Sequence, residues 1–229
     1  MSLMHCTKIL AIEFSSSVRS VAVLDLRPDG ATPVLLGCAS EEGGRSIRPL
    51  PLVDLALERA QVEREAVECL AIGLGPGSYT GIRSAIALAQ GWQLARPVNL
   101  IGVSSAEGLA AAAHAQGWFG SVGVVIDAQR GEFYFAGYEI GESGWHVKDP
   151  LRIALKAEAA ALAAAYPTIA GPEATAFFPA GRVLFPDAKV VGGLGHGRSD
   201  FTPGENLEPI YLRETQFVKA PPPRSVPGL

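Results

Sequence analysis

The sequence predicts an α/β protein in which two related halves each contain a mixed sheet. Three observations lead to this prediction. Predicted strands alternate with predicted helices through the first half of the chain. The pattern of a buried strand, a carboxylate and a second strand starts again at Val122. Hydrophobic residues make up 48% of the 229 positions and charged residues 18%, which is enough apolar material for a sizeable core.

The elements of the first half follow from their apolar patterns. Continuous or alternating apolar residues predict strands at residues 8–14, 20–26, 33–39, 70–74 and 97–103. Apolar residues at helical spacing predict helices at residues 49–60, 81–95 and 104–115. The first two strands form a hairpin around a serine turn, and the later strands are separated by helices. A sheet with both antiparallel and parallel neighbours is therefore expected.

The second half repeats the start of the first. Residues 9–13 form a buried strand that ends in Glu13, and residues 122–127 form a buried strand that ends in Asp127. A strand at 132–139, a helix at 155–165 and short strands at 168–170 and 189–191 are expected after it. We place an N-terminal half at 1–104, a C-terminal half at 105–219 and a mobile Pro-rich tail at 220–229.

Composition excludes several classes of protein. The net charge is −4 and the Lys and Arg residues form no dense run, so tight RNA binding by this chain alone is not expected. No apolar stretch approaches the roughly 20 residues that span a membrane. The three cysteines are far apart in the sequence, so neither a disulfide framework nor a zinc site is expected. We expect a cytoplasmic protein.

A glycine-rich loop stands between a predicted strand and a predicted helix. It matches neither the P-loop nor the dinucleotide-binding pattern. One interpretation is an anion site at the helix N-terminus. The other is a glycine turn that lets the helix pack tightly on the sheet. The loop consists of Gly75, Pro76, Gly77, Ser78, Tyr79, Thr80 and Gly81.

The helix after this loop is apolar on most sides, and the start of the helix at 49–60 is similar. A helix that is apolar all round is buried all round, which indicates a second protein over its outer face. The alternative is a helix enclosed within the monomer. The residues predicted to contact a partner are Leu52, Leu55, Ala56, Arg83, Ile86, Ala89, Gln90, Trp92 and Gln93.

Familiar catalytic patterns are missing from the sequence. The four histidines form no metal-binding pair on a helix, and no nucleophile elbow is present. We therefore predict no catalytic and no metal-binding residue. Glu13, Ser15 and Asp127 could form a vestigial nucleotide site between the two halves. The alternative is that such carboxylates are ordinary turn or cap residues at strand ends.

Several segments together resemble the TsaB (YeaZ) family, whose wider group is labelled glycoprotease-like (M22). The resemblance is dense over residues 8–140 and returns at 209–213. Its most distinctive motif is the sequence GPGSYTGIR at 75–83, and it includes the opening ILAIEFSSS at 9–17 and VIDAQR at 125–130. The resemblance implies the actin, Hsp70 and sugar-kinase (ASKHA) fold, whose halves are RNase H-like.

The resemblance also implies a function. Family members pair with TsaD, the metal-bearing paralogue that transfers a threonylcarbamoyl group to adenosine 37 of tRNAs that read codons beginning with A. TsaE joins the complex, and tRNA would be contacted only indirectly. The chain would be a non-catalytic scaffold within a threonylcarbamoyltransferase complex, and a homodimer when alone. No cofactor is assigned to this chain, and binding of ATP or ADP with Mg²⁺ is considered only at the level of the complex.

Two other functions remain open at this point. One is an ATP-dependent kinase or ATPase of the same fold, and a weaker one is a glycoprotease-like metallopeptidase. The family usually has Asp where Glu13 stands, and the longer side chain moves the carboxylate. This difference counts against a nucleotide site, as does the lack of a phosphate-loop lysine. The lack of metal-ligand spacing counts against the peptidase.

Overall fold

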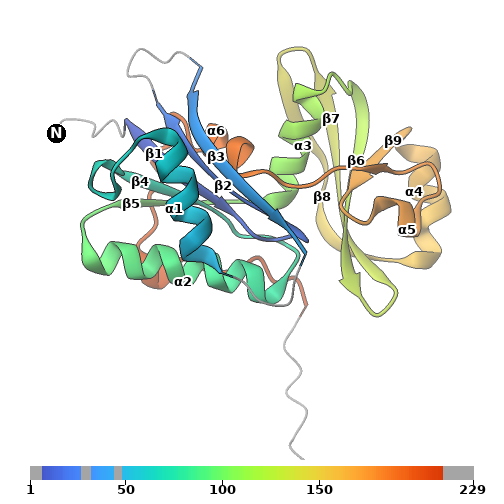
Figure 1. The fold of residues 1–229 in the computed structure, drawn as a ribbon. Coiled ribbons are helices and arrows are strands. Elements are labelled where there is room, and N and C mark those ends of the chain that lie inside the picture. Colours follow the sequence, from blue (N-terminus) through green and yellow to red (C-terminus); the bar gives the residue numbers. More distant parts are fainter. Residues whose placement is uncertain (1–6, 27–31, 44–47, 214–229) are drawn as a thin grey trace, which may run out of the picture.

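The computed structural model describes residues 7–26, 32–43 and 48–213 (Figure 1). Cys6 and the predicted tail at 220–229 lie outside the described residues. Within these ranges the strands form two five-stranded sheets. The first contains, in spatial order, β3 (Val34–Glu42), β2 (Val18–Asp25), β1 (Lys8–Glu13), β4 (Cys69–Gly73) and β5 (Asn99–Val103). The second contains β10 (Arg182–Val183), β9 (Thr168–Gly171), β6 (Gly120–Gln129), β7 (Glu132–Gly141) and β8 (Gly144–Leu155).

The two sheets have the same topology. In the first, β1 pairs antiparallel with β2 and parallel with β4. The outer pairs have the same directions, since β2 and β3 are antiparallel and β4 and β5 are parallel. In the second, β6 pairs antiparallel with β7 and parallel with β9, again with matching outer pairs. The order β3-β2-β1-β4-β5 in the first sheet therefore corresponds, strand by strand, to the order β8-β7-β6-β9-β10 in the second. The predicted fold class, two related halves with mixed sheets, is confirmed.

Helices cover both faces of the first sheet. The side chains of β1 alternate, so Leu10 and Ile12 face α1 (Pro49–Ala60) and α2 (Tyr79–Ala95), while Ile9 and Ala11 face α6 (Ala188–Leu194). All four β1 side chains are fully buried. A strand that is apolar on both faces is typical of a sheet covered on both sides.

The second sheet is covered in the same way. The Ala-rich helix α3 (Ser105–Ala115) packs on the face of β6 that carries Val122 and Val124. On the other face, α4 (Ala159–Ala165) and α5 (Ala174–Phe177) pack against an aromatic cluster that includes Phe133 and Phe135. Three single-turn 3₁₀ helices complete the described elements: η1 (Arg64–Ala66), η2 (Lys156–Glu158) and η3 (Gly204–Asn206).

The prediction of a strand at 189–191 is wrong, because these residues lie in helix α6. The β-branched residues of this segment favour a strand locally. However, the carboxylate of Asp187 accepts a hydrogen bond from the Lys189 N–H at 2.8 Å and caps a helix. A Cβ at Gly192 would lie 2.4 Å from Leu24 Cδ1, so this glycine brings α6 directly onto the first sheet.

The end of the described chain returns to the first half. Ile210 donates its N–H to the Leu74 carbonyl at 2.9 Å, and Tyr211 stacks on Tyr79 with ring centroids 5.8 Å apart. Arg213 reaches the second sheet, where it donates to the Ala128 carbonyl at 3.1 Å. This segment therefore contacts both sheets. No helix within the described ranges is long and apolar enough to cross a membrane.

Candidate functional site

The glycine loop joins β4 to α2, and its small residues are used for close packing. A Cβ at Gly77 would lie 2.1 Å from the Ser15 carbonyl oxygen, and one at Gly81 would lie 1.9 Å from that of Phe14. Ser15 O accepts from the Ser78 N–H at 2.7 Å, and Ser78 Oγ accepts from the Gly81 N–H at 3.2 Å. The start of α2 is thus pressed against the turn after β1. This geometry favours the packing interpretation of the loop, because protein carbonyls lie where an anion would approach.

Glu13 connects the strand end to this loop. Its side chain is fully buried. Its Oε1 accepts from the Ser15 N–H at 2.7 Å and its Oε2 from the Ser105 hydroxyl at 2.7 Å. Ser105 Oγ in turn accepts from the Gly75 N–H at 3.1 Å. Burial raises the pKa of Glu13 above its ordinary value, against the opposing effect of the hydrogen bonds from Ser15 and Ser105. The carboxylate is a structural link among β1, the glycine loop and α3.

A polar cavity of about 870 Å³, the interhalf cavity, lies between residues of the two halves. Ser15 and Asp127 both line it, whereas Glu13 does not. The carboxylate of Asp127 accepts from the Gln129 N–H at 2.8 Å and from its side-chain amide at 2.6 Å. The complete lining is Ser15, Ser16, Ser17, Arg19, Gly43, Gly77, Ser78, Tyr79, Ile126, Asp127, Ala128, Gln129, Arg130, Tyr134, Glu173, Tyr211 and Arg213.

The carboxylates of Asp127 and Glu173, which line this cavity, both accept hydrogen bonds from protein groups. Glu173 Oε2 accepts from the Asp127 N–H at 3.2 Å. Burial, followed by the charge of Asp127, raises the pKa of Glu173. Among the described residues, no group of three or more His, Cys, Asp and Glu side chains is placed to hold a metal ion. The prediction of a vestigial nucleotide site stays a prediction, with two of its three residues at the cavity.

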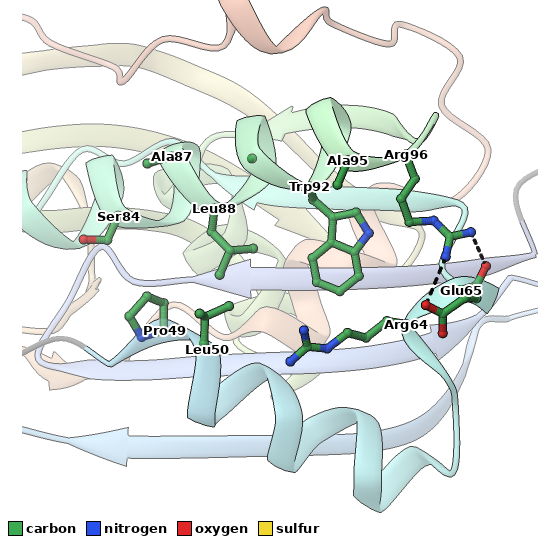
Figure 2. Close-up of a pocket in the computed structure, with 11 residues that line it drawn as sticks. Pro49, Leu50, Arg64, Glu65, Ser84, Ala87, Leu88, Trp92, Ala95 and Arg96 are labelled. Carbon is green, nitrogen blue, oxygen red and sulfur yellow. Dashed lines mark hydrogen bonds and ion pairs between the residues drawn. The ribbon is translucent and has the colours of Figure 1, made fainter.

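A second hollow, the α1–α2 groove, runs along the outer side of α2 and has a volume of about 730 Å³ (Figure 2). Leu88 of α2 faces Pro49 and Leu50 at the start of α1 across it, and Trp92 lies opposite the side chain of Arg64. Leu50 is 53% exposed. The groove is lined by Pro49, Leu50, Arg64, Glu65, Ser84, Ala87, Leu88, Gly91, Trp92, Ala95 and Arg96.

Small residues create this groove. Ser84, Ala87, Gly91 and Ala95 fall three or four positions apart and therefore share one side of α2. A Cβ at Gly91 would meet nothing within 4 Å. Larger side chains at these positions would fill the space between the helices. Their small size leaves Leu88 and Trp92 as the apolar walls.

Of the nine residues predicted to contact a partner, Trp92 lines this groove. Four others have side chains buried in the chain's own core: Leu52, Ala56, Ile86 and Ala89. Leu55 is exposed on α1. Sequence reasoning missed the other ten lining residues. The spacing of small residues along α2 was the signal that could have found Ser84, Ala87, Gly91 and Ala95.

The three remaining predicted residues have structural roles on α2. Arg83 is exposed, with its guanidinium 4.4 Å from the ring centre of Tyr79. Gln90 donates to the Gly204 carbonyl at 2.8 Å. Gln93 accepts from the Gly204 N–H at 2.8 Å and donates to the Val98 carbonyl at 3.0 Å. The two glutamines hold η3 and the end of α2 in place.

Comparison with known proteins identifies the family. Residues 45–195 match the family described as "TsaD: tRNA N6-adenosine threonylcarbamoyltransferase". The solved structure titled "YeaZ from Pseudomonas aeruginosa" superposes with a TM-score of 0.73 at 27% identity, over 90% of this chain and 100% of that one. The chain belongs to the TsaB (YeaZ) family. A second Pseudomonas aeruginosa structure, titled as an uncharacterized protein with similarity to peptidase YEAZ, has a TM-score of 0.74 at 26% identity, with the same coverage.

Curated TsaB proteins agree with this assignment. The TsaB protein of Escherichia coli K12 is 35% identical over 140 residues, which are 61% of this chain and 58% of that protein. The protein of Bacillus subtilis 168 is 32% identical over 133 residues, 57% of this chain and 55% of that protein. Both are named "tRNA threonylcarbamoyladenosine biosynthesis protein TsaB". The matched region thus spans somewhat over half the length of each TsaB relative.

Proposed function

We propose that this TsaB-family chain takes part in the biosynthesis of threonylcarbamoyladenosine on tRNA, as a non-catalytic partner that docks on TsaD through the α1–α2 groove. The names of the relatives support the pathway, and the family match at 45–195 covers both helices of the groove. The observation that supports docking is the groove itself, because soluble proteins rarely leave such an apolar hollow uncovered without a binding role.

The chemistry of the groove suits a protein partner. Trp92 and Arg96 belong to the residue types that dominate interface energies. Leu50 and Leu88 offer aliphatic surface, and full burial of such a side chain contributes about 1.5–3 kcal/mol. The ion pair between Arg96 and Glu65 closes one end of the groove with polar atoms (Figure 2). An apolar centre with a polar rim is the usual anatomy of a specific interface.

The family resemblance also places TsaE in the complex, and we assign it no surface on this chain. Contact with tRNA would be made by the complex, and position 37 of tRNAs that read codons beginning with A would be selected by the catalytic partner. The homodimer expected for the isolated chain would use the same groove. Because one surface serves both assemblies, TsaD and a second copy of this chain should compete.

Size-exclusion chromatography with light scattering tests the proposal. The chain is measured alone, with TsaD from the same organism, and with TsaD plus ATP and Mg²⁺. We expect a complex with one copy of each protein, formed at the expense of any homodimer. If no complex forms in any of these conditions, the proposed partner role is wrong.

A further inference from the structure

Within the described ranges, the chain passes between the two halves at three places. Ser104 alone joins β5 of the first sheet to α3, which packs on the second sheet. Residues 184–187 lead from β10 of the second sheet back to α6 on the first. The last passage is the strap, which we define as residues 207–213. It runs from the core of the first half to the second sheet.

The first two passages lie near the contact between α3 and α6 (Figure 1). A Cβ at Gly108 of α3 would lie 3.9 Å from Cγ2 of Val191 in α6, so the two helices are in van der Waals contact here. Neither helix contributes a residue to the lining of the interhalf cavity. Short connections beside one helix contact are the usual arrangement of a hinge between domains. A rotation of the halves about this contact would change the width of the cavity.

The strap is attached to the first half at several points. Leu207 is buried in the core of the first half. Ile210 donates its N–H to the Leu74 carbonyl at 2.9 Å. The hydroxyl of Tyr211 accepts a hydrogen bond from Arg83 Nε at 3.0 Å. A buried side chain, a backbone hydrogen bond and a ring contact therefore hold the strap along the first half.

Arg213, the last residue of the strap, contacts the β6–β7 turn of the second half. Its guanidinium donates to the Ala128 carbonyl at 3.1 Å and forms an ion pair with the Glu132 carboxylate. These two acceptors stand on either side of the turn. The side chains of Arg213 and Glu132 are 33% and 29% exposed. A guanidinium that is partly shielded from water and donates to two acceptors holds its partner more firmly than a fully exposed ion pair does.

The strap has little slack between its attachments to the two halves. From Ile210 to Arg213 the chain advances three residues, which span at most about 11 Å when fully extended. A rotation that widens the cavity must therefore break the contacts of Arg213 or pull the strap off the first half. Because the strap has several anchors on the first half, the contacts of Arg213 are the ones that break first.

We propose that the strap is a latch, in which Arg213 holds the β6–β7 turn against the first half and so fixes the width of the interhalf cavity. When Arg213 is released, the halves rotate about the α3–α6 contact and the cavity widens. Tyr211 and Arg213 both line the cavity, so the latch is also part of its wall. The latch concerns this chain alone and does not rest on the proposed function.

Residual dipolar couplings of the backbone N–H groups test the latch in the full chain. The couplings report the orientation of each N–H in one alignment frame, so two halves that move together share one alignment tensor. We expect one tensor to fit both halves of the unaltered chain. In Arg213→Ala we expect each half to require its own tensor. Glu132→Gln removes the charge of the ion pair from the other side and should have the same effect.

Arg130→Ala is the matched control. Arg130 lies in the same β6–β7 turn and lines the same cavity. The substitution removes one positive charge from the cavity and leaves Arg213, Ala128 and Glu132 in place. One tensor should still fit both halves. If Arg130→Ala separates the two tensors as strongly as Arg213→Ala does, the charge of the cavity and not the latch holds the halves, and the proposal is wrong.

Three other outcomes would overturn the latch. One tensor could fit both halves in Arg213→Ala and Glu132→Gln alike, or the unaltered chain could already require two. Hydrogen exchange of the Ile210 N–H gives the third, because this group is bonded to the first half. We expect its protection to be the same in Arg213→Ala and in the unaltered chain. Faster exchange would show that Arg213 keeps the strap on the first half and does not lock the two halves together.

Discussion

Gly81→Ala tests the packing of the glycine loop. Helix propensity alone predicts that Ala stabilises the interior of α2 by about 1 kcal/mol. The structure predicts the opposite, because the new Cβ would lie 1.9 Å from the Phe14 carbonyl oxygen. Relief requires α2 to move away from the turn after β1 by about 1 Å, and overpacking this close against backbone costs about 2–3 kcal/mol, the upper part of the usual range. We expect a net loss of about 1–2 kcal/mol of unfolding free energy.

Gly91→Ala is the matched control, since the same substitution in the same helix meets nothing within 4 Å. It should stabilise the chain by about 1 kcal/mol. Urea unfolding followed by circular dichroism measures both, and the two variants should differ by about 2–3 kcal/mol. Equal stabilisation by the two substitutions would refute the inferred contact between α2 and Phe14.

Three further predictions concern Glu13 and its partners. Burial raises the pKa of Glu13, so its contribution to stability is complete below its ordinary pKa of 4.5 and is lost as the pH rises through the raised pKa. The unfolding free energy of the unaltered chain should therefore fall with increasing pH more steeply than that of Glu13→Gln. If the unfolding free energies of the two proteins changed in parallel with pH, this prediction would be wrong. Ser105→Ala removes the hydroxyl between Glu13 and Gly75 and should cost about 1–3 kcal/mol in urea unfolding, with Ser104→Ala as a milder control. Millimolar ATP with Mg²⁺ should leave the melting temperature unchanged, because protein donors already occupy both Glu13 oxygens; a clear rise would restore the nucleotide-enzyme hypothesis.

Much of the fold follows from patterns that are local in the sequence. The continuous apolar runs at β1 and β6, each ending in a carboxylate, indicated the duplication that the strand order shows. The segment of α6 was predicted incorrectly because its β-branched residues favour a strand, whereas the cap at Asp187 and the contact made by Gly192 depend on tertiary position. Propensity is a weak guide wherever packing decides the element.

The partner surface was harder to predict. The all-round apolar character of α2 indicated burial on most sides, but it could not show which side faces the core. The structure places Ile86 in the core and leaves Ala87 exposed in the groove. Ile86→Glu would consequently destabilise the monomer before it could report on an interface. Ala87, an inconspicuous residue in the sequence, is the better position for a test.

The affinity of Ala87→Glu for TsaD tests the central claim most directly. Ala87 is exposed on a helix, so the substitution should change folding stability by less than about 0.5 kcal/mol. In a docked complex the new carboxylate would be buried without a partner, which costs about 2 kcal/mol or more, or at least about thirtyfold in affinity. Ala164→Glu, an identical change at an exposed position of α4 outside the groove, is the control. By titration calorimetry we expect Ala87→Glu to bind at least thirtyfold more weakly than Ala164→Glu. Equal affinities would show that TsaD does not dock in the α1–α2 groove.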